Sequence, residues 1–145
     1  MDQPILEKSD IKKLIPHRDP ILLINNVLSY SPEEIICSKY LDKNNPVFKG
    51  HFENNPIYPG IYLLEAMAQA GAVKINLDAK DNTKPKGTYV ILKIENAKFK
   101  HPVLPSTIVK YAVSTTTIDP YHVMQCKALV NDSVVASAKI TTMIK

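Results

Sequence analysis

The chain has 145 residues, of which 45% are hydrophobic and 22% are charged. This length favours one domain spanning residues 1–145. The composition is typical of a folded globular protein, which excludes a wholly disordered chain and a collagen-like fibre. The net charge is +4, but Arg18 is the only arginine among the 18 basic residues. Because arginine reads phosphates and bases better than lysine does, nucleic acid is not an expected partner.

The sequence predicts a cytoplasmic protein without a membrane span. No uncharged apolar run approaches the roughly 18 residues that a membrane span needs. The opening segment MDQPILEKSDIKKLIPH carries acids and lysines and lacks the apolar stretch of a signal peptide. Cys37 and Cys126 lie in strand-like runs without a CxxC pair. We therefore expect two buried free thiols rather than a structural disulfide.

The first part of the chain predicts a short helix and a β-hairpin. Residues 9–15, SDIKKLI, carry a helical apolar stripe and end at a proline. Residues 21–30 and 34–42 are predicted as two strands joined by the turn SPE. Residues 43–60 hold three prolines, two glycines and four asparagines. This composition predicts a long loop, and loops of that length inside a compact domain are usually functional or disordered. Its aromatic residues favour a packed, functional loop.

Residues 61–77 predict the one long helix of the protein. They are rich in good helix formers, and Pro59 and Gly60 suit a helix start. The segment is apolar nearly all round, which is typical of a buried helix. A polar loop is expected over 78–87, followed by strands at 88–100, 107–118, 121–131 and 133–144. The sum predicts an α+β fold in which a curved antiparallel sheet wraps round one long central helix.

Glu65 is the one acidic residue in the apolar part of this helix. A carboxyl group buried among apolar neighbours is favoured in its protonated form, which suits a general acid. Gln69 at i+4 and Tyr62 at i−3 share its helix face. The alternative is a helix edge that reaches solvent, with Glu65 merely exposed. The residues alone favour neither interpretation.

His51 and Gly60 lie immediately before that helix. His51 follows a glycine in the aromatic loop, so it is either a plain surface residue or the base that pairs with Glu65. The amide of Gly60 lies at a helix N-terminus, where backbone N–H groups stabilise a developing oxyanion. Simple helix capping explains Gly60 equally well.

The other histidines do not predict a further site. His17, His101 and His122 are widely spaced and have no HxxxH or CxxC partner, so no zinc site is expected. The sequence contains no glycine-rich nucleotide loop, and no metal or cofactor is predicted. We interpret His17, which follows Pro16, as a structural residue at the helix stop.

Three segments of the chain form a distinctive set, namely LIPHRDPILLINNV at 14–27, GHFENNPIYPGIYLLEAMAQAGA at 50–72 and IENAKFKHPVLPS at 94–106. They resemble the FabZ-type (3R)-hydroxyacyl-acyl-carrier-protein dehydratases. Their order and spacing match the family over essentially the whole chain. The family's HFPG is HFEN here, and its PGD-like turn is Pro105-Ser106-Thr107. Asn54 adopts a positive φ more readily than most residues, so we expect the first turn to survive.

The resemblance implies a hot-dog fold and a homodimer with two active sites at its interface. His51 of one subunit would act as the base and Glu65 of the other as the acid. Gln69 would support the carboxyl group, and the Gly60 amide would polarise the thioester. The remaining substrate contacts implied are Phe52, Tyr58 and Ile61. Family members often assemble further into trimers of dimers.

The same resemblance implies a reaction and a partner. A 3-hydroxyacyl thioester on an acyl carrier protein would lose water and become a trans-2-enoyl thioester, without a metal or redox cofactor. Because such carriers are strongly acidic, Lys98 and Lys100 are predicted to favour docking. Two alternatives stay open: a hot-dog acyl thioesterase, and a non-catalytic subunit that binds the carrier.

Overall fold

The computed structural model describes residues 3–79 and 87–145. Its helices are α1 (Lys8–Leu14), α2 (Val47–Gly50) and α3 (Gly60–Asp78). Its strands are β1 (Asn26–Tyr30), β2 (Ile35–Leu41), β3 (Tyr89–Phe99), β4 (Thr107–Ile118), β5 (Tyr121–Val130) and β6 (Ser133–Ile144). Residues 80–86 of the loop predicted over 78–87 lie outside the described residues. Among the described residues, no helix is both long and apolar enough to cross a bilayer.

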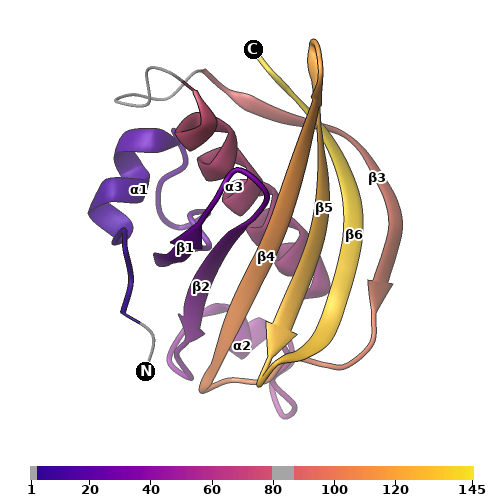
Figure 1. The fold of residues 1–145 in the computed structure, drawn as a ribbon. Helices are drawn as coiled ribbons and strands as arrows, with labels where there is room; N and C mark the ends of the chain where they lie inside the picture. The colour runs from indigo at the N-terminus through magenta and orange to yellow at the C-terminus, as the bar shows by residue number, and fades with distance from the viewer. Residues whose placement is uncertain (1–2, 80–86) are drawn as a thin grey trace.

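The six strands form one antiparallel sheet in the order β1-β2-β4-β5-β6-β3. Strands β4, β5 and β6 follow one another as hairpins. Strand β3 follows the long helix α3 in the chain. It pairs with β6 at the far edge of the sheet. The sheet curves around α3, and α1 covers the side of α3 that faces away from the sheet (Figure 1). The α+β arrangement predicted from the sequence is therefore confirmed.

Helix α3 is buried over most of its length, from Leu63 to Asn76, with Glu65 as the exception. Alanines and Gly71 supply much of its surface, which lets the helix lie close to β2, β4 and β5. A Cβ atom on Gly71 would lie 2.3 Å from the sulfur of Met124 in β5. Small residues at this contact therefore set how closely helix and sheet approach. The predicted buried helix is confirmed.

The strand predicted over residues 21–30 is wrong in its first half. The structure begins β1 at Asn26, and residues 21–25 form no strand. Their backbone bonds to a helix side chain instead: Leu23 N–H donates to Oε1 of Gln69, and the carbonyl of Ile21 accepts from Nε2 of Gln69. An alternation of apolar residues does not reveal such a competing partner.

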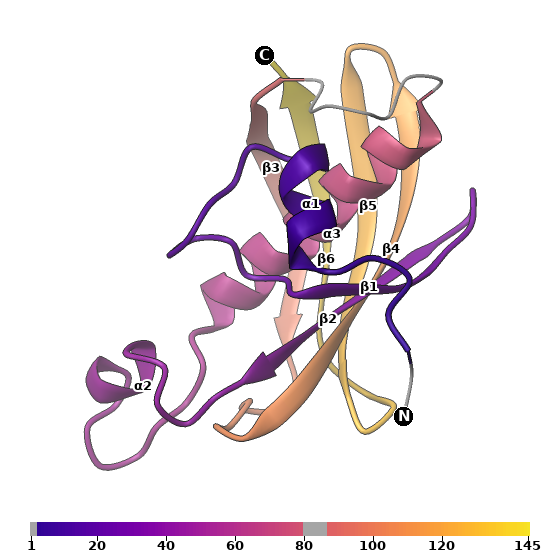
Figure 2. The ribbon, with the colours of Figure 1, turned by 90° about the vertical axis from the view of Figure 1, so that its left-hand side faces the viewer.

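The long loop predicted over 43–60 contains the short helix α2, which Figure 2 shows at the end of the molecule where α3 begins.

Cys37 in β2 and Cys126 in β5 are buried free thiols, as predicted. Burial raises the pKa of each thiol to about 12, so neither is a reactive thiolate at neutral pH.

Candidate active site

The loop after α2 fixes the imidazole of His51. Its Nδ1 lies 2.8 Å from the carbonyl oxygen of Ile57. Because a carbonyl only accepts, Nδ1 carries the proton in the neutral ring and Nε2 keeps a free lone pair. The ring stacks on Phe52 with centroids 4.0 Å apart. The loop therefore holds His51 in the tautomer that a general base requires.

Backbone hydrogen bonds close the loop that carries His51. Phe52 and Asn55 exchange N–H to carbonyl bonds of 3.3 and 3.0 Å, and Ile57 N–H donates to His51 O at 2.8 Å. Asn54 does not have a positive φ, so the turn survives without the left-handed residue that we expected there. Ser106 does, with φ 61°, where the family pattern has glycine.

The N-terminus of α3 opens into a cavity of about 350 Å³. Its first amides, at Gly60 and Ile61, have no acceptor within the helix. Gly60, Phe99 and Lys100 line this cavity together with Tyr58, whose buried hydroxyl has no hydrogen-bond partner among the described residues. Ile61 is 70% exposed at the helix start. The structure thus brings the predicted residues Tyr58 and Gly60 to one cavity.

Glu65 lies one and a half turns further along α3. Its side chain is 28% exposed, so it is neither fully buried nor free in solvent. Gln69 Nε2 donates to Glu65 Oε1 at 2.9 Å. His17 Nε2 lies 3.7 Å from the same oxygen. Both predicted alternatives for Glu65, a fully buried acid and a plain exposed edge, give way to a carboxyl group held at one oxygen.

The amide of Gln69 has only one possible orientation. Its Oε1 accepts the N–H of Leu23 at 2.8 Å, so its Nε2 faces Ile21 O at 2.7 Å and Glu65. Glu65 Oε1 must therefore accept, and a proton on this carboxyl group belongs on Oε2. Within the described residues no hydrogen bond is recorded for Oε2. The residue predicted to support the acid thus leaves one oxygen of Glu65 ready to donate a proton.

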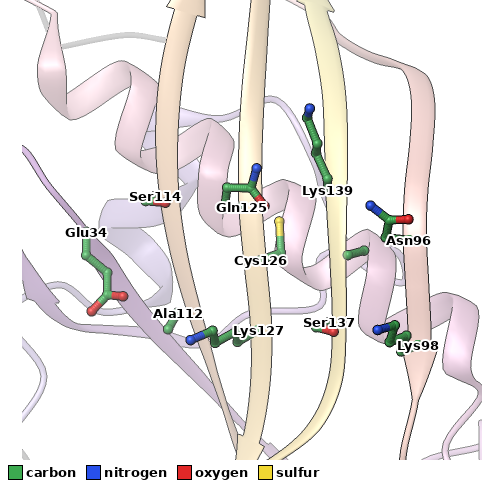
Figure 3. Close-up of a pocket in the computed structure, with 11 residues that line it drawn as sticks. Glu34, Asn96, Lys98, Ala112, Ser114, Gln125, Cys126, Lys127, Ser137 and Lys139 are labelled. Atoms are coloured by element: carbon green, nitrogen blue, oxygen red, sulfur yellow. The ribbon is translucent and has the colours of Figure 1, made fainter.

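The resemblance assigns His51 and Glu65 to different subunits, and no direct pair between them is found in the described part of one protomer. Over residues 3–79 and 87–145, no hydrogen bond or ion pair joins His51 to Glu65. Lys98 and Lys100 also diverge: Lys100 lines the cavity at Gly60, whereas Lys98 lines a depression on the face of the sheet opposite α3 (Figure 3). Lys100 follows Phe99, the last residue of β3, so the alternation along the strand does not place it on the same face as Lys98. The two lysines line different depressions.

Comparisons with known proteins identify the family. A family model described as a FabA-like domain matches residues 15–139. The 3-hydroxyacyl-[acyl-carrier-protein] dehydratase FabZ of Ehrlichia canis is 41% identical over 139 residues, which cover 94% of this chain and 93% of that protein. The chain belongs to the FabZ dehydratase family. The protein of the same name from Campylobacter concisus is 35% identical, over 97% of this chain and 98% of its own length.

Solved structures support the fold of this FabZ-family chain. The dehydratase heterocomplex ApeI:P from Xenorhabdus doucetiae has a TM-score of 0.80 at 14% identity, covering 94% of this chain and 91% of that chain. The TT0310 protein from Thermus thermophilus has a TM-score of 0.62 at 16% identity, covering 89% and 100%. The predicted hot-dog fold is confirmed.

One neighbour of Glu65 was missed in the sequence. His17 was interpreted as structural, yet its ring lies beside Glu65, 48 positions away in the chain. The signal was its place in the segment LIPH, which resembles the family as strongly as the loop of His51 does. Periodicity carries no information about a contact made by an irregular segment.

Gly60→Ala tests the helix N-terminus of this FabZ-family chain. A Cβ atom there would lie 2.8 Å from Phe99 Cε1, so we expect the ring to move and narrow the cavity. Because alanine suits the first turn of a helix, the fold should remain intact. The variant keeps the N–H at position 60, but the narrowed cavity should keep a substrate oxygen away from it, and the expected loss in kcat/KM is about 10²-fold, the scale of losing one oxyanion donor. Steady-state kinetics and circular dichroism would measure both effects, and an unchanged rate would show that substrate does not approach this end of the helix.

Proposed function

We propose that the chain removes water from (3R)-hydroxyacyl thioesters carried on an acyl carrier protein and releases trans-2-enoyl thioesters. The FabZ relatives carry this activity in their names, at up to 41% identity over nearly full length. The observation that carries the proposal here is the proton placement. His51 presents a bare Nε2, and Glu65 keeps one oxygen free of hydrogen bonds in the described structure. An elimination that needs one base and one acid uses both.

The elimination moves two protons and breaks one C–O bond. His51 Nε2 takes the proton from C2, and the electrons of the C–H bond pass into the thioester as an enolate. The amide of Gly60 stabilises the enolate oxygen. As the C2–C3 double bond forms, Glu65 Oε2 gives its proton to the departing C3 hydroxyl group, and water leaves. His51 then loses its proton and Glu65 regains one, which restores the starting state.

A second copy of the chain completes the proposed site. Strand β3 is an edge strand of eleven residues. An exposed apolar edge of this length invites pairing with another strand. Four large apolar side chains of β3 are 37–51% exposed, namely Ile91, Leu92, Ile94 and Phe99. We infer a homodimer joined at β3, in which His51 acts with Glu65 of the partner subunit.

The direct test is the formation of the conjugated product. Purified protein is incubated with a short 3-hydroxyacyl carrier protein, and ultraviolet absorbance follows the enoyl thioester. Absorbance that rises with the wild type and stays flat with His51→Ala supports the dehydratase. Release of free thiol, detected by a thiol reagent, would instead indicate a thioesterase. Tight carrier binding without product would indicate a non-catalytic subunit.

Charge reversal at Lys100 tests the docking of the acidic carrier. Because Lys100 lines the cavity at Gly60, we expect Lys100→Glu to raise KM for a carrier-bound substrate about tenfold at low salt. KM for a small pantetheine thioester should stay constant. Lys98→Glu is the matched control: it reverses the same charge on the opposite face of the sheet and should have the smaller effect. Equal effects of both variants would contradict docking at this cavity.

Three further statements stay predictions. They are the single domain over residues 1–145, the cytoplasmic location and the assembly into trimers of dimers. The last of these is measured by light scattering of the purified protein, which separates a dimer from a hexamer by mass.

A further inference from the structure

The segment between α1 and β1 is tied to α3 at two points. Asn76 Nδ2 donates to Leu14 O at 3.1 Å, near the C-terminal end of α3. Gln69 bonds to the backbone of Ile21 and Leu23, more than one turn earlier in the helix. His17 lies in the short stretch between these anchors. Its position relative to α3 is therefore fixed by hydrogen bonds on either side.

Arg18 fixes the local backbone of that stretch. Its guanidinium group donates to the carbonyl oxygens of Lys12, Ile15 and His17, at 2.7–2.9 Å. The bonds to Lys12 O and Ile15 O supply donors for carbonyl groups at the C-terminal end of α1, which have no partner within the helix. The ring of His17 is thereby directed toward α3, where its Nε2 lies 3.7 Å from Glu65 Oε1.

The imidazole of His17 is neutral at neutral pH. Burial lowers its pKa, and this outweighs the opposing effect of Glu65; Arg18 lowers the pKa further. A neutral ring carries one proton, on either Nδ1 or Nε2. Nδ1 is buried and has no hydrogen-bond partner within residues 3–79 and 87–145. Since an unpaired buried N–H is costly, the proton belongs on Nε2, which faces the carboxyl group.

We propose that His17 is a positioning residue for the acid: its Nε2–H holds Glu65 Oε1 together with the amide of Gln69, and so keeps the reactive proton on Oε2. The proposal rests on the proposed function. At 3.7 Å the contact is longer than a hydrogen bond. Catalytic hydrogen bonds of this kind are often long without substrate and tighten when it binds. His17 then also stabilises the carboxylate that remains after Glu65 has donated its proton.

Two substitutions at position 17 separate this role from a merely structural one. His17→Gln places an amide N–H near the position of Nε2, whereas His17→Asn places it near Nδ1 and leaves Glu65 Oε1 with Gln69 alone. Both variants are neutral and polar. We expect His17→Asn to lower kcat about tenfold with little change in KM, and His17→Gln to lose less than about threefold.

The pH profile supplies a second readout. The proposed elimination needs the carboxyl group of Glu65 in its protonated form. Without the Nε2–H donor the carboxylate is less stabilised, so the alkaline limb of kcat/KM should move up by about half a pH unit in His17→Asn. In His17→Gln the alkaline limb of kcat/KM should stay at its wild-type position. The charged groups that act on His17 are Glu65 and Arg18, and both are intact in these variants.

Nitrogen NMR of the imidazole tests the tautomer without turnover. With ¹⁵N-labelled histidine, the signal of His17 is assigned by its loss in His17→Gln. We expect a neutral ring protonated at Nε2 at pH 7. A ring protonated at Nδ1, or a charged imidazolium, would overturn the proposal.

Glu65→Gln distinguishes a failure of the proposed function from a failure of the role proposed for His17. If Glu65→Gln keeps the wild-type rate, the acid assignment fails, and the role of His17 fails with it. If Glu65→Gln is inactive while His17→Asn has the wild-type rate and profile, the role of His17 alone is overturned. The same holds if His17→Gln and His17→Asn lose equal activity, because the position of the donor then has no effect.

Discussion

Replacing His51 by alanine or Glu65 by glutamine should abolish dehydration while the protein stays folded. General acid and base groups each contribute about 10²–10⁴-fold to rates of this kind, so we expect kcat to fall by that factor in each variant. Glu65→Gln keeps an acceptor oxygen for Gln69 and removes the ionisable proton. Rapid-quench or absorbance assays with a 3-hydroxyacyl carrier protein measure the loss. Turnover near the wild-type rate in either variant would refute its assignment.

The two inactive variants together test whether the site is shared between subunits. After denaturation and refolding of an equal mixture, half of the dimers should contain one chain of each kind. If His51 acts with Glu65 of the partner subunit, each mixed dimer has one intact site, and the mixture regains about a quarter of the wild-type activity. If both residues act within one chain, no site is intact and no activity returns. Mixing without refolding is the control.

Asp78→Ala should lower the free energy of unfolding more than any other substitution proposed above. Lys74 is only 1% exposed at the side chain, and its ammonium group donates to Asp78 Oδ2 at 2.8 Å and to Thr115 Oγ1 at 3.0 Å. Asp78 also accepts from the hydroxyl of Tyr30, so it joins α3 to β1. Removing it leaves the buried ammonium group without a counter-charge in the part of the chain that the structure describes, which costs roughly 3 kcal/mol. At this chain length that lowers Tm by roughly 6–12 °C.

Lys74→Met is the matched control for Asp78→Ala. Methionine fills a similar volume without a charge, and replacing a buried ion pair by apolar groups is often neutral. We expect it to change the free energy of unfolding by less than about 1.5 kcal/mol. Urea denaturation at one fixed protein concentration compares the two variants, since dimerisation makes Tm concentration-dependent. A larger loss in Lys74→Met than in Asp78→Ala would contradict this account.

The positions of the long helix and of five strands were predictable because they depend on local pattern. The helix predicted over 61–77 is found at Gly60–Asp78, and the last three strands match to within a residue or two. A run of strong helix formers such as leucine, alanine and methionine acts within one segment, and so does an alternation of apolar and polar residues. The hairpin strand at 21–30 failed because Gln69, far along the chain, offers its backbone a different partner.

The sequence by itself determined the α+β class, the buried helix and the residues Glu65, Gln69 and His51, because each follows from neighbours within a few positions or from a motif. Only the tertiary structure decided how these side chains are held. It selected the tautomer of His51 through Ile57, left Oε2 of Glu65 free through Gln69, and placed His17 beside the acid. It also put Lys98 and Lys100 at different depressions of the surface. Hydrogen-bond partners and exposed faces depend on segments that meet only when the chain folds.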